Sequence, residues 1–182
     1  ELVRNSMEVA MPNFSMGIKS PFPGTGIDGI RREMAAEIAT EALFGESSEL
    51  YMGLYEAGLI DSSFGGGFET IDGCAMLMCS GDSDDPNAVR DAILAGAGAI
   101  VTGGIPDGDF LRMKRSALGR RIRSLDSFDA TCFRVCAYHF SGFDYFRFPE
   151  VYRSIEACEI QAFLNAVVKE ERCSLSIINP LS

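Results

Sequence analysis

Histidine is almost absent from this sequence, which has one histidine and no tryptophan among its 182 residues. The single histidine, His139, cannot build the multi-ligand site with which a zinc hydrolase holds its metal. A serine or cysteine nucleophile would also depend on His139 as its base, and no G-x-S-x-G motif is present. We therefore expect no catalytic residue and no metal site in this chain, and we interpret His139 as a packing residue.

Long apolar runs are missing too. No stretch approaches the ~20 apolar residues that a membrane-spanning helix needs, and the first residues are charged where a secretory signal would be apolar. None of the six cysteines forms a C-x-x-C pair. Cys132 and Cys136 share a helical face, where thiols usually act as small core residues. We expect all six to be reduced and structural, as in a cytoplasmic protein.

Positive charge is scarce, with 16 basic against 26 acidic residues and a net charge of −10. This balance argues against nucleic acid or an anionic membrane as a partner. The basic residues gather in RMKRSALGRRIR (112–123), where Arg112, Arg120 and Arg123 share the outward side of a helical wheel. That side could dock an acidic partner domain or a peptide terminus, or it could be a solvated helix face. Both interpretations stay open.

The hydrophobic pattern predicts a single α+β domain over residues 1–182, with a mostly antiparallel sheet and helices packed on one face. The chain begins with Glu, so we expect it to be part of a longer protein. The first expected elements are a strand at 9–19, a helix at 27–44 and a helix from Ser47 or Ser48 to Gly58. A hairpin then turns at Asp72-Gly73 into a central strand at 74–79 that is apolar on both faces. After it we expect a helix capped by Asp84 or Asp85, a helix with Leu111, Leu118, Ile122 and Leu125 on its apolar face, helices at 126–140, 144–154 and 156–169, and a strand at 173–178.

Three adjacent glycines, at 65–67, leave one strand edge without side chains. Such a segment indicates a close approach by another backbone or a β-bulge, and the sequence does not decide between them.

The stretch FGESSELYMGLYEAGLIDSSF (44–64) resembles a segment of the pitrilysin/insulinase-like zinc metallopeptidases, whose pattern is approximately L-x-G-x-S-S-x-L-Y-x-x-L-R-x-x-G-L-x-Y. VAMPNFSMGIK (9–19) is similar to the first strand of that family's second domain, and KRSALGRRIRSLDS (114–127) is similar to its long helix. The resemblance covers nearly the whole chain and looks closest to a bacterial two-domain subgroup.

This resemblance implies that the chain is the second, non-catalytic domain of a pair of homologous domains that close around a peptide. It implies that zinc, a water and a general-base glutamate act in an N-terminal domain that carries H-x-x-E-H, and that this fragment alone is inactive. The implied partners are that N-terminal domain, a peptide substrate and a possible homologous partner subunit.

The sequence departs from the family pattern at two positions. Tyr55 stands where the family has a substrate-contacting arginine, and Asp61, or Ser62 with one more residue of spacing, stands where it has a tyrosine. A tyrosine cannot offer the bidentate fork of a guanidinium. Tyr55, Asp61 and Phe64 remain candidate contacts with substrate or partner, as do Arg112, Arg120 and Arg123. A catalytically dead scaffold is the alternative function, and an unrelated enzyme that uses His139 is a third.

Overall fold

The computed structural model describes residues 1–71 and 73–181. Its strands form one sheet in the order β1-β5-β2-β4-β3. They are β1 (Leu2–Met7), β2 (Asn13–Ser20), β3 (Gly65–Ile71), β4 (Cys74–Asp82) and β5 (Cys173–Pro180). Among the described strands, only the β1–β5 pair is parallel, and the other three pairs are antiparallel. The predicted α+β class with a mostly antiparallel sheet is confirmed.

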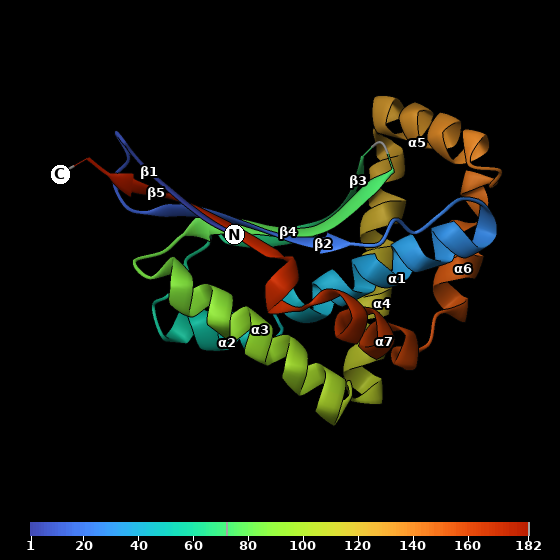
Figure 1. The fold of residues 1–182 in the computed structure, drawn as a ribbon. Coiled ribbons are helices and arrows are strands. Elements are labelled where there is room, and N and C mark those ends of the chain that lie inside the picture. Colours follow the sequence, from blue (N-terminus) through green and yellow to red (C-terminus); the bar gives the residue numbers. More distant parts are fainter. Residues whose placement is uncertain (72, 182) are drawn as a thin grey trace.

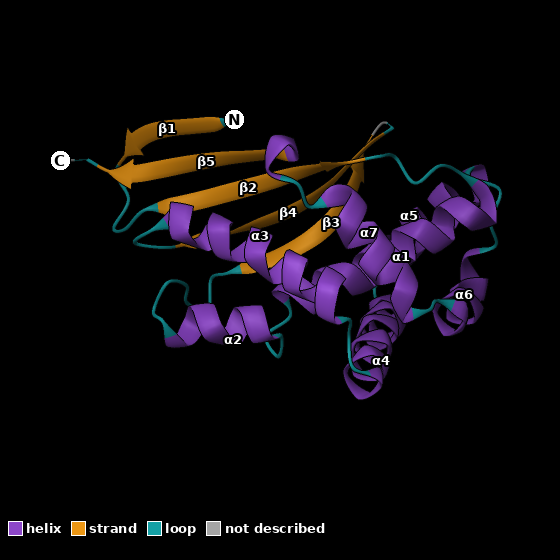
Figure 2. Ribbon diagram, turned by 60° about the horizontal axis from the view of Figure 1, so that its bottom comes forward, coloured by secondary structure: helices purple, strands orange, loops and turns teal. Residues whose placement is uncertain are grey.

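The helices of the described chain are α1 (Gly26–Phe44), α2 (Glu49–Glu56), α3 (Pro86–Gly103), α4 (Asp107–Arg123), α5 (Phe128–Phe140), α6 (Phe148–Ser154) and α7 (Ala157–Val167). Figures 1 and 2 show α1, α3 and α7 on one face of the sheet, while no helix of the described residues lies over the opposite face. The helical layer therefore leaves one sheet face open.

The boundaries of α1, α2 and β3 follow from local sequence features, as predicted. Ile30, Met34 and Ile38 of α1 are buried every four residues. The hydroxyl of Ser48 accepts a hydrogen bond from the Tyr51 N–H at 3.0 Å and caps α2. Gly58 then takes a positive φ of 69°, which reverses the chain toward β3.

Alternation along the strands places the core under one sheet face. Phe14, Met16 and Ile18 of β2 are buried together with Leu77 of β4 and Leu175 of β5. On the opposite face, Met76 and Met78 of β4 are only half-buried, since nothing in the described chain packs over them. β4 is apolar on both faces, as predicted, but only one of those faces lies in the core.

Two strand predictions differ from the structure. The strand predicted at 9–19 begins at Asn13, and β1 was not predicted. All six β1 residues are exposed, so the strand carries no buried alternation, and its partner β5 lies at the other end of the chain. The Asp72-Gly73 hairpin falls partly outside the described residues. Gly73 has a φ of 79°, and Ile71 pairs with Cys74.

The predicted apolar face of α4 is half right, since Leu118 and Leu125 are partly buried and pack against the core. Leu111 and Ile122 are 45% and 50% exposed, and the buried stripe is Met113, Ala117 and Arg121. An arginine can occupy a core position when carboxylates and hydroxyls engage its donors. Arg121 meets this condition, because Glu37 of α1 and Tyr138 of α5 engage its guanidinium.

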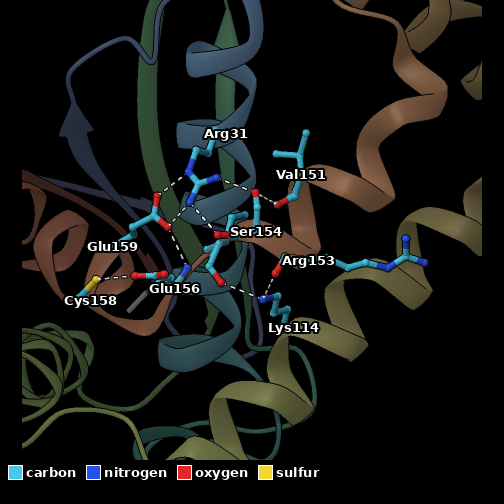
Figure 3. A network of polar contacts seen from close by, with 9 residues as sticks. Arg31, Lys114, Val151, Arg153, Ser154, Glu156, Cys158 and Glu159 are labelled. Atoms are coloured by element: carbon cyan, nitrogen blue, oxygen red, sulfur yellow. Dashed lines mark hydrogen bonds and ion pairs between the residues drawn. The ribbon is translucent and has the colours of Figure 1, made fainter.

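A polar network fixes α6 against α1, α4 and α7 (Figure 3). Arg31 of α1 forms an ion pair with Glu159 of α7 at 2.7 Å and donates to the Ser154 carbonyl at the end of α6. Lys114 of α4 donates to the carbonyls of Arg153 and Ile155, both at 2.7 Å. Two cations thus satisfy backbone carbonyls at one helix end, which stabilises the helical layer.

Candidate functional site

The free edge of β3 lies near the predicted contact residues Phe64 and Arg120. β3 pairs with β4 on one side only, which leaves its other edge unpaired. We call Gly65–Gly67 the glycine edge. Two hollows share Gly65 and Gly66: one of about 500 Å³ toward α1 and α4, and one of about 350 Å³ on the open face of the sheet.

The three glycines have different reasons to be there. A Cβ on Gly66 would lie 2.7 Å from the Met78 carbonyl oxygen and 2.9 Å from Cγ of Phe44. A Cβ on Gly65 or Gly67 would meet no atom within 4 Å. The pairing of β3 with β4 is continuous from Gly65 to Ile71, so the β-bulge interpretation is wrong. Packing requires glycine only at position 66, and positions 65 and 67 are open.

Two of the predicted arginines lie at the rim of the larger hollow. Arg120 lines it and forms an ion pair with Glu41 of α1 at 2.6 Å. Arg112 donates to the hydroxyl of Ser47, another lining residue, and pairs with Asp109 at 3.2 Å. Arg123 is exposed one turn further along α4. The described residues offer Arg123 no ion-pair partner.

Phe64 lies at the floor of this hollow, and aromatic contacts link it to α2. Phe64 is 6% exposed and packs against Phe44 and Tyr51 with ring centroids 6.0 Å apart in each case. Tyr51 stacks on Tyr55 at 6.1 Å, and Tyr55 is 54% exposed. Tyr55 therefore presents its ring to solvent beside the site rather than inside the hollow.

Asp61 holds the turn that leads into β3. Its carboxylate accepts the Ser63 N–H at 2.7 Å, and this hydrogen-bonded contact with Ser63 lowers the pKa of Asp61. The structure thus brings Phe64 and Arg120 together, places Arg112 at the rim, and leaves Tyr55, Asp61 and Arg123 outside the hollow.

Sequence reasoning missed a buried charge network next to the other end of β3. Arg121, 7% exposed, donates to the hydroxyl of Tyr138 at 2.8 Å and to the carboxylate of Glu37. The Tyr138 hydroxyl donates to Glu33, and burial raises the pKa of Glu33. These groups line a hollow of about 390 Å³ between α1, α5 and β3. The spacing of Glu33 and Glu37 inside an apolar helix was the available signal.

The thiols and the histidine lie differently from the prediction. Cys132 and Cys136 are exposed on α5, and His139 is exposed beside Phe140. Only Cys79 and Cys173 are buried, and burial raises the pKa of Cys79 to about 12. The predictions of a packing histidine and of core thiols at 132 and 136 are therefore wrong.

The donor groups do not fit a catalytic zinc ion. Across residues 1–71 and 73–181, no three His, Cys, Asp or Glu side chains lie close enough to hold a metal. A zinc hydrolase site needs such a group of ligands. In the same residues, no helix has both the length and the apolar character needed to span a bilayer.

Comparisons with known proteins agree on one kind of domain. The family model described as the peptidase M16 inactive domain matches residues 1–117. A Bacillus subtilis (strain 168) protein named the uncharacterized zinc protease YmfH is 27% identical over 180 residues, which are 97% of this chain and 41% of that protein. This chain therefore spans about two fifths of that relative's length.

Two solved structures share the fold. An M16-like protein of Alicyclobacillus acidocaldarius superimposes with a TM-score of 0.89 at 21% identity, over 99% of this chain and 43% of that one. The inactive peptidase domain of a Bordetella parapertussis protein superimposes with a TM-score of 0.74 at 14% identity, over 97% of this chain and 95% of that one.

Proposed function

Because the chain belongs to the family of M16 peptidase inactive domains, we propose that it is the second, non-catalytic domain of a longer zinc peptidase and forms one wall of a peptide-binding chamber. In this proposal the other domain of the parent holds the zinc and performs proteolysis. This chain contributes shape and backbone contacts, and none of its residues takes part in the chemical step.

The observation that carries the proposal is the glycine edge beside an open sheet face. A free strand edge offers unpaired N–H and C=O groups to an extended peptide, which can add to the sheet as a further strand. At Gly65 and Gly67 no side chain blocks that approach. The hollows on either side give room for alternate side chains of the peptide, which point to opposite faces.

Charge at the rim would orient the peptide. Arg120 forms an ion pair with Glu41, and the arginine is the more exposed of the two side chains. The guanidinium therefore still faces the hollow as a cation. Glu69 lines the hollow on the open face. A bound peptide would therefore meet one cation on the helix side and one carboxylate on the open side.

The size of the relatives supports a partner domain within one parent chain. This chain covers 41% of YmfH and 43% of the Alicyclobacillus protein, so each of them has room for another domain of this size. We further propose that the parent protein is cytoplasmic and that a homologous subunit is a second candidate partner.

Peptide cleavage by the parent and by this chain tests the proposal. The parent should carry H-x-x-E-H upstream and cleave peptides in a chelator-sensitive reaction, while this chain alone should not. Gly67→Val in the parent should raise KM about threefold to tenfold, because the added side chain fills the open hollow. Serine at the same position is the matched control and should change KM less. Chelator-sensitive cleavage by this chain alone would contradict the proposal.

A catalytically dead scaffold is the second candidate, and one observation favours it. Tyr55 and Asp61 replace the arginine and tyrosine of the family pattern, and Asp61 is engaged in its own turn. A parent without H-x-x-E-H, or without activity, would support the scaffold.

A further inference from the structure

The hollow of about 390 Å³ between α1, α5 and β3 combines aromatic walls with a charged floor. The rings of Phe22, Phe68 and Phe133 line it, together with Glu33 and Arg121. Phe22 and Phe133 are 45% and 74% exposed, so both rings are open to solvent, whereas Arg121 is 7% exposed. A long side chain that enters this hollow would therefore pass apolar rings before it reaches the charged groups.

The charges on the floor are not balanced at Glu33. Glu37 forms an ion pair with Arg121 and accepts the hydroxyl of Tyr152 on its other oxygen. Glu33 lies 3.8 Å from Arg121 and accepts the hydroxyl of Tyr138 through Oε1, but among the described residues no hydrogen bond reaches its Oε2. Burial, with Glu37 close by, raises the pKa of Glu33 in spite of these partners. A further cation beside Oε2 would stabilise this carboxylate.

The hollow as a whole has an excess of negative charge. The charged side chains that line it are the carboxylates of Glu33, Glu37 and Glu69 and the guanidiniums of Arg121 and Arg134. Glu69 also lines the hollow on the open face of the sheet, so the two hollows meet at this residue on the free edge of β3. The excess charge therefore lies next to the edge that is open to a peptide.

A peptide paired along β3 would pass this hollow. Side chains alternate between the two faces of a strand, so Gly66, Phe68 and Thr70 face the helix side. Gly66 lines the hollow toward α1 and α4, and Phe68 and Thr70 line the hollow described here. Every second side chain of such a peptide would point to the same side and would meet first one hollow and then the other.

We propose that this hollow binds the side chain of a lysine or arginine of the captured peptide. The apolar stem lies along Phe22 and Phe133, and the cationic head reaches the carboxylate of Glu33. Repulsion by Arg121 is small because Glu37 pairs with that guanidinium. The domain thus selects basic peptides. This selection rests on the proposed function, in which the edge of β3 captures an extended peptide.

Peptides that differ by one ammonium group test this inference. In a fluorescein-labelled, lysine-rich peptide, norleucine replaces lysine at one position at a time, and the initial fluorescence anisotropy gives the Kd for the parent protein. At one position norleucine should weaken binding about tenfold, because a charge-assisted hydrogen bond is lost. In the Glu33→Gln parent the same replacement should change the Kd less than about twofold. Equal binding of all the peptides overturns the inference, and so does an undiminished loss in the Glu33→Gln parent.

Two further variants serve as controls. Glu150→Gln removes a carboxylate that does not line the hollow and should keep the tenfold difference. Glu69→Gln, at an exposed position on the rim, should reduce the difference about twofold to threefold. If Glu33→Gln does not fold, an unchanged difference in Glu69→Gln overturns the inference.

Peptide cleavage in the same samples separates this inference from the proposed function. A parent that cleaves lysine and norleucine peptides alike overturns the inference alone. A parent that prefers lysine but cleaves nothing supports the inference, while the peptidase function fails. A parent that binds none of the peptides overturns both.

Discussion

The aromatic ring of Phe44 fills the space that a side chain at Gly66 would need. Phe44 ends α1, and Gly66 lies in the edge strand β3, so this contact joins the helical layer to the glycine edge. The neighbours of Gly66 along the strand have no such restriction.

Gly66→Ala should therefore destabilise the chain. The new methyl group would lie 2.7 Å from the Met78 carbonyl, a backbone atom that cannot move away freely. Overpacking of this kind costs about 1–3 kcal/mol. Urea unfolding measures the loss, and Gly67→Ala is the matched control because its Cβ meets nothing within 4 Å. Equal effects at the two positions would show that the contact with Phe44 is unimportant.

Arg121→Met should lower stability by more. The substitution removes the cation that serves Glu37, Glu33 and Tyr138, and it leaves partly buried carboxylates without compensation. Breaking a buried ion pair from one side costs about 3–5 kcal/mol, and the partial exposure of both glutamates places the expected loss near the lower end. Arg123→Met on the same helix should change the free energy of unfolding by less than about 0.5 kcal/mol. A loss at Arg121 no larger than that at Arg123 would be evidence against the network.

Glu159→Gln should change how stability depends on pH. The hydrogen bond from Arg31 lowers the pKa of Glu159 below its ordinary value of 4.5. The ionised carboxylate therefore stabilises the fold above the unfolded-state pKa, and this contribution is lost as the pH falls through the lowered folded-state pKa.

The glutamine variant should be less stable at pH 7, by about 0.5–1 kcal/mol because the pair is partly solvated, and the difference should vanish in acid. Thermal unfolding from pH 7 to pH 3 tests this. Glu150→Gln, in the more exposed pair with Arg147, should show little change at any pH.

The chain alone should bind no stoichiometric zinc. Its donor groups form no cluster of three within residues 1–71 and 73–181. Equilibrium dialysis against zinc followed by elemental analysis should give well under one equivalent, and a chelator should leave the unfolding temperature unchanged. A full equivalent held by this chain's own side chains would contradict our account of where the metal lies.

Much of the fold follows from signals close together in sequence. The α1 periodicity, the Ser48 cap, the positive φ at Gly58 and the Asp85 cap, which accepts from Asn87 and Ala88 at 3.1 Å, each depend on neighbouring residues. The site depends on distant partners. Arg121 belongs to the basic run 112–123, but its hydrogen bonds with Glu37 and Tyr138 place it in the core.

The exposed aromatics of α5 were missed for a related reason. A helix rich in Phe and Cys predicts a position in the core of its own domain, whereas Phe128, Phe133 and Phe140 are exposed. β1 lacked any periodic signal, because its order comes from pairing with β5. Among the predicted contacts, Phe64 and Arg120 converged because the β3 edge and α4 flank the same end of α1.

The bare β3 edge also makes the domain prone to self-association. Strand edges in native proteins are usually guarded by lysine, proline or a bulge. β3 has none of these, and Glu69 is its only charged residue. An edge that accepts an extended peptide accepts a strand of another molecule equally well. Aggregation should therefore compete with peptide capture whenever the domain is concentrated and the edge is empty.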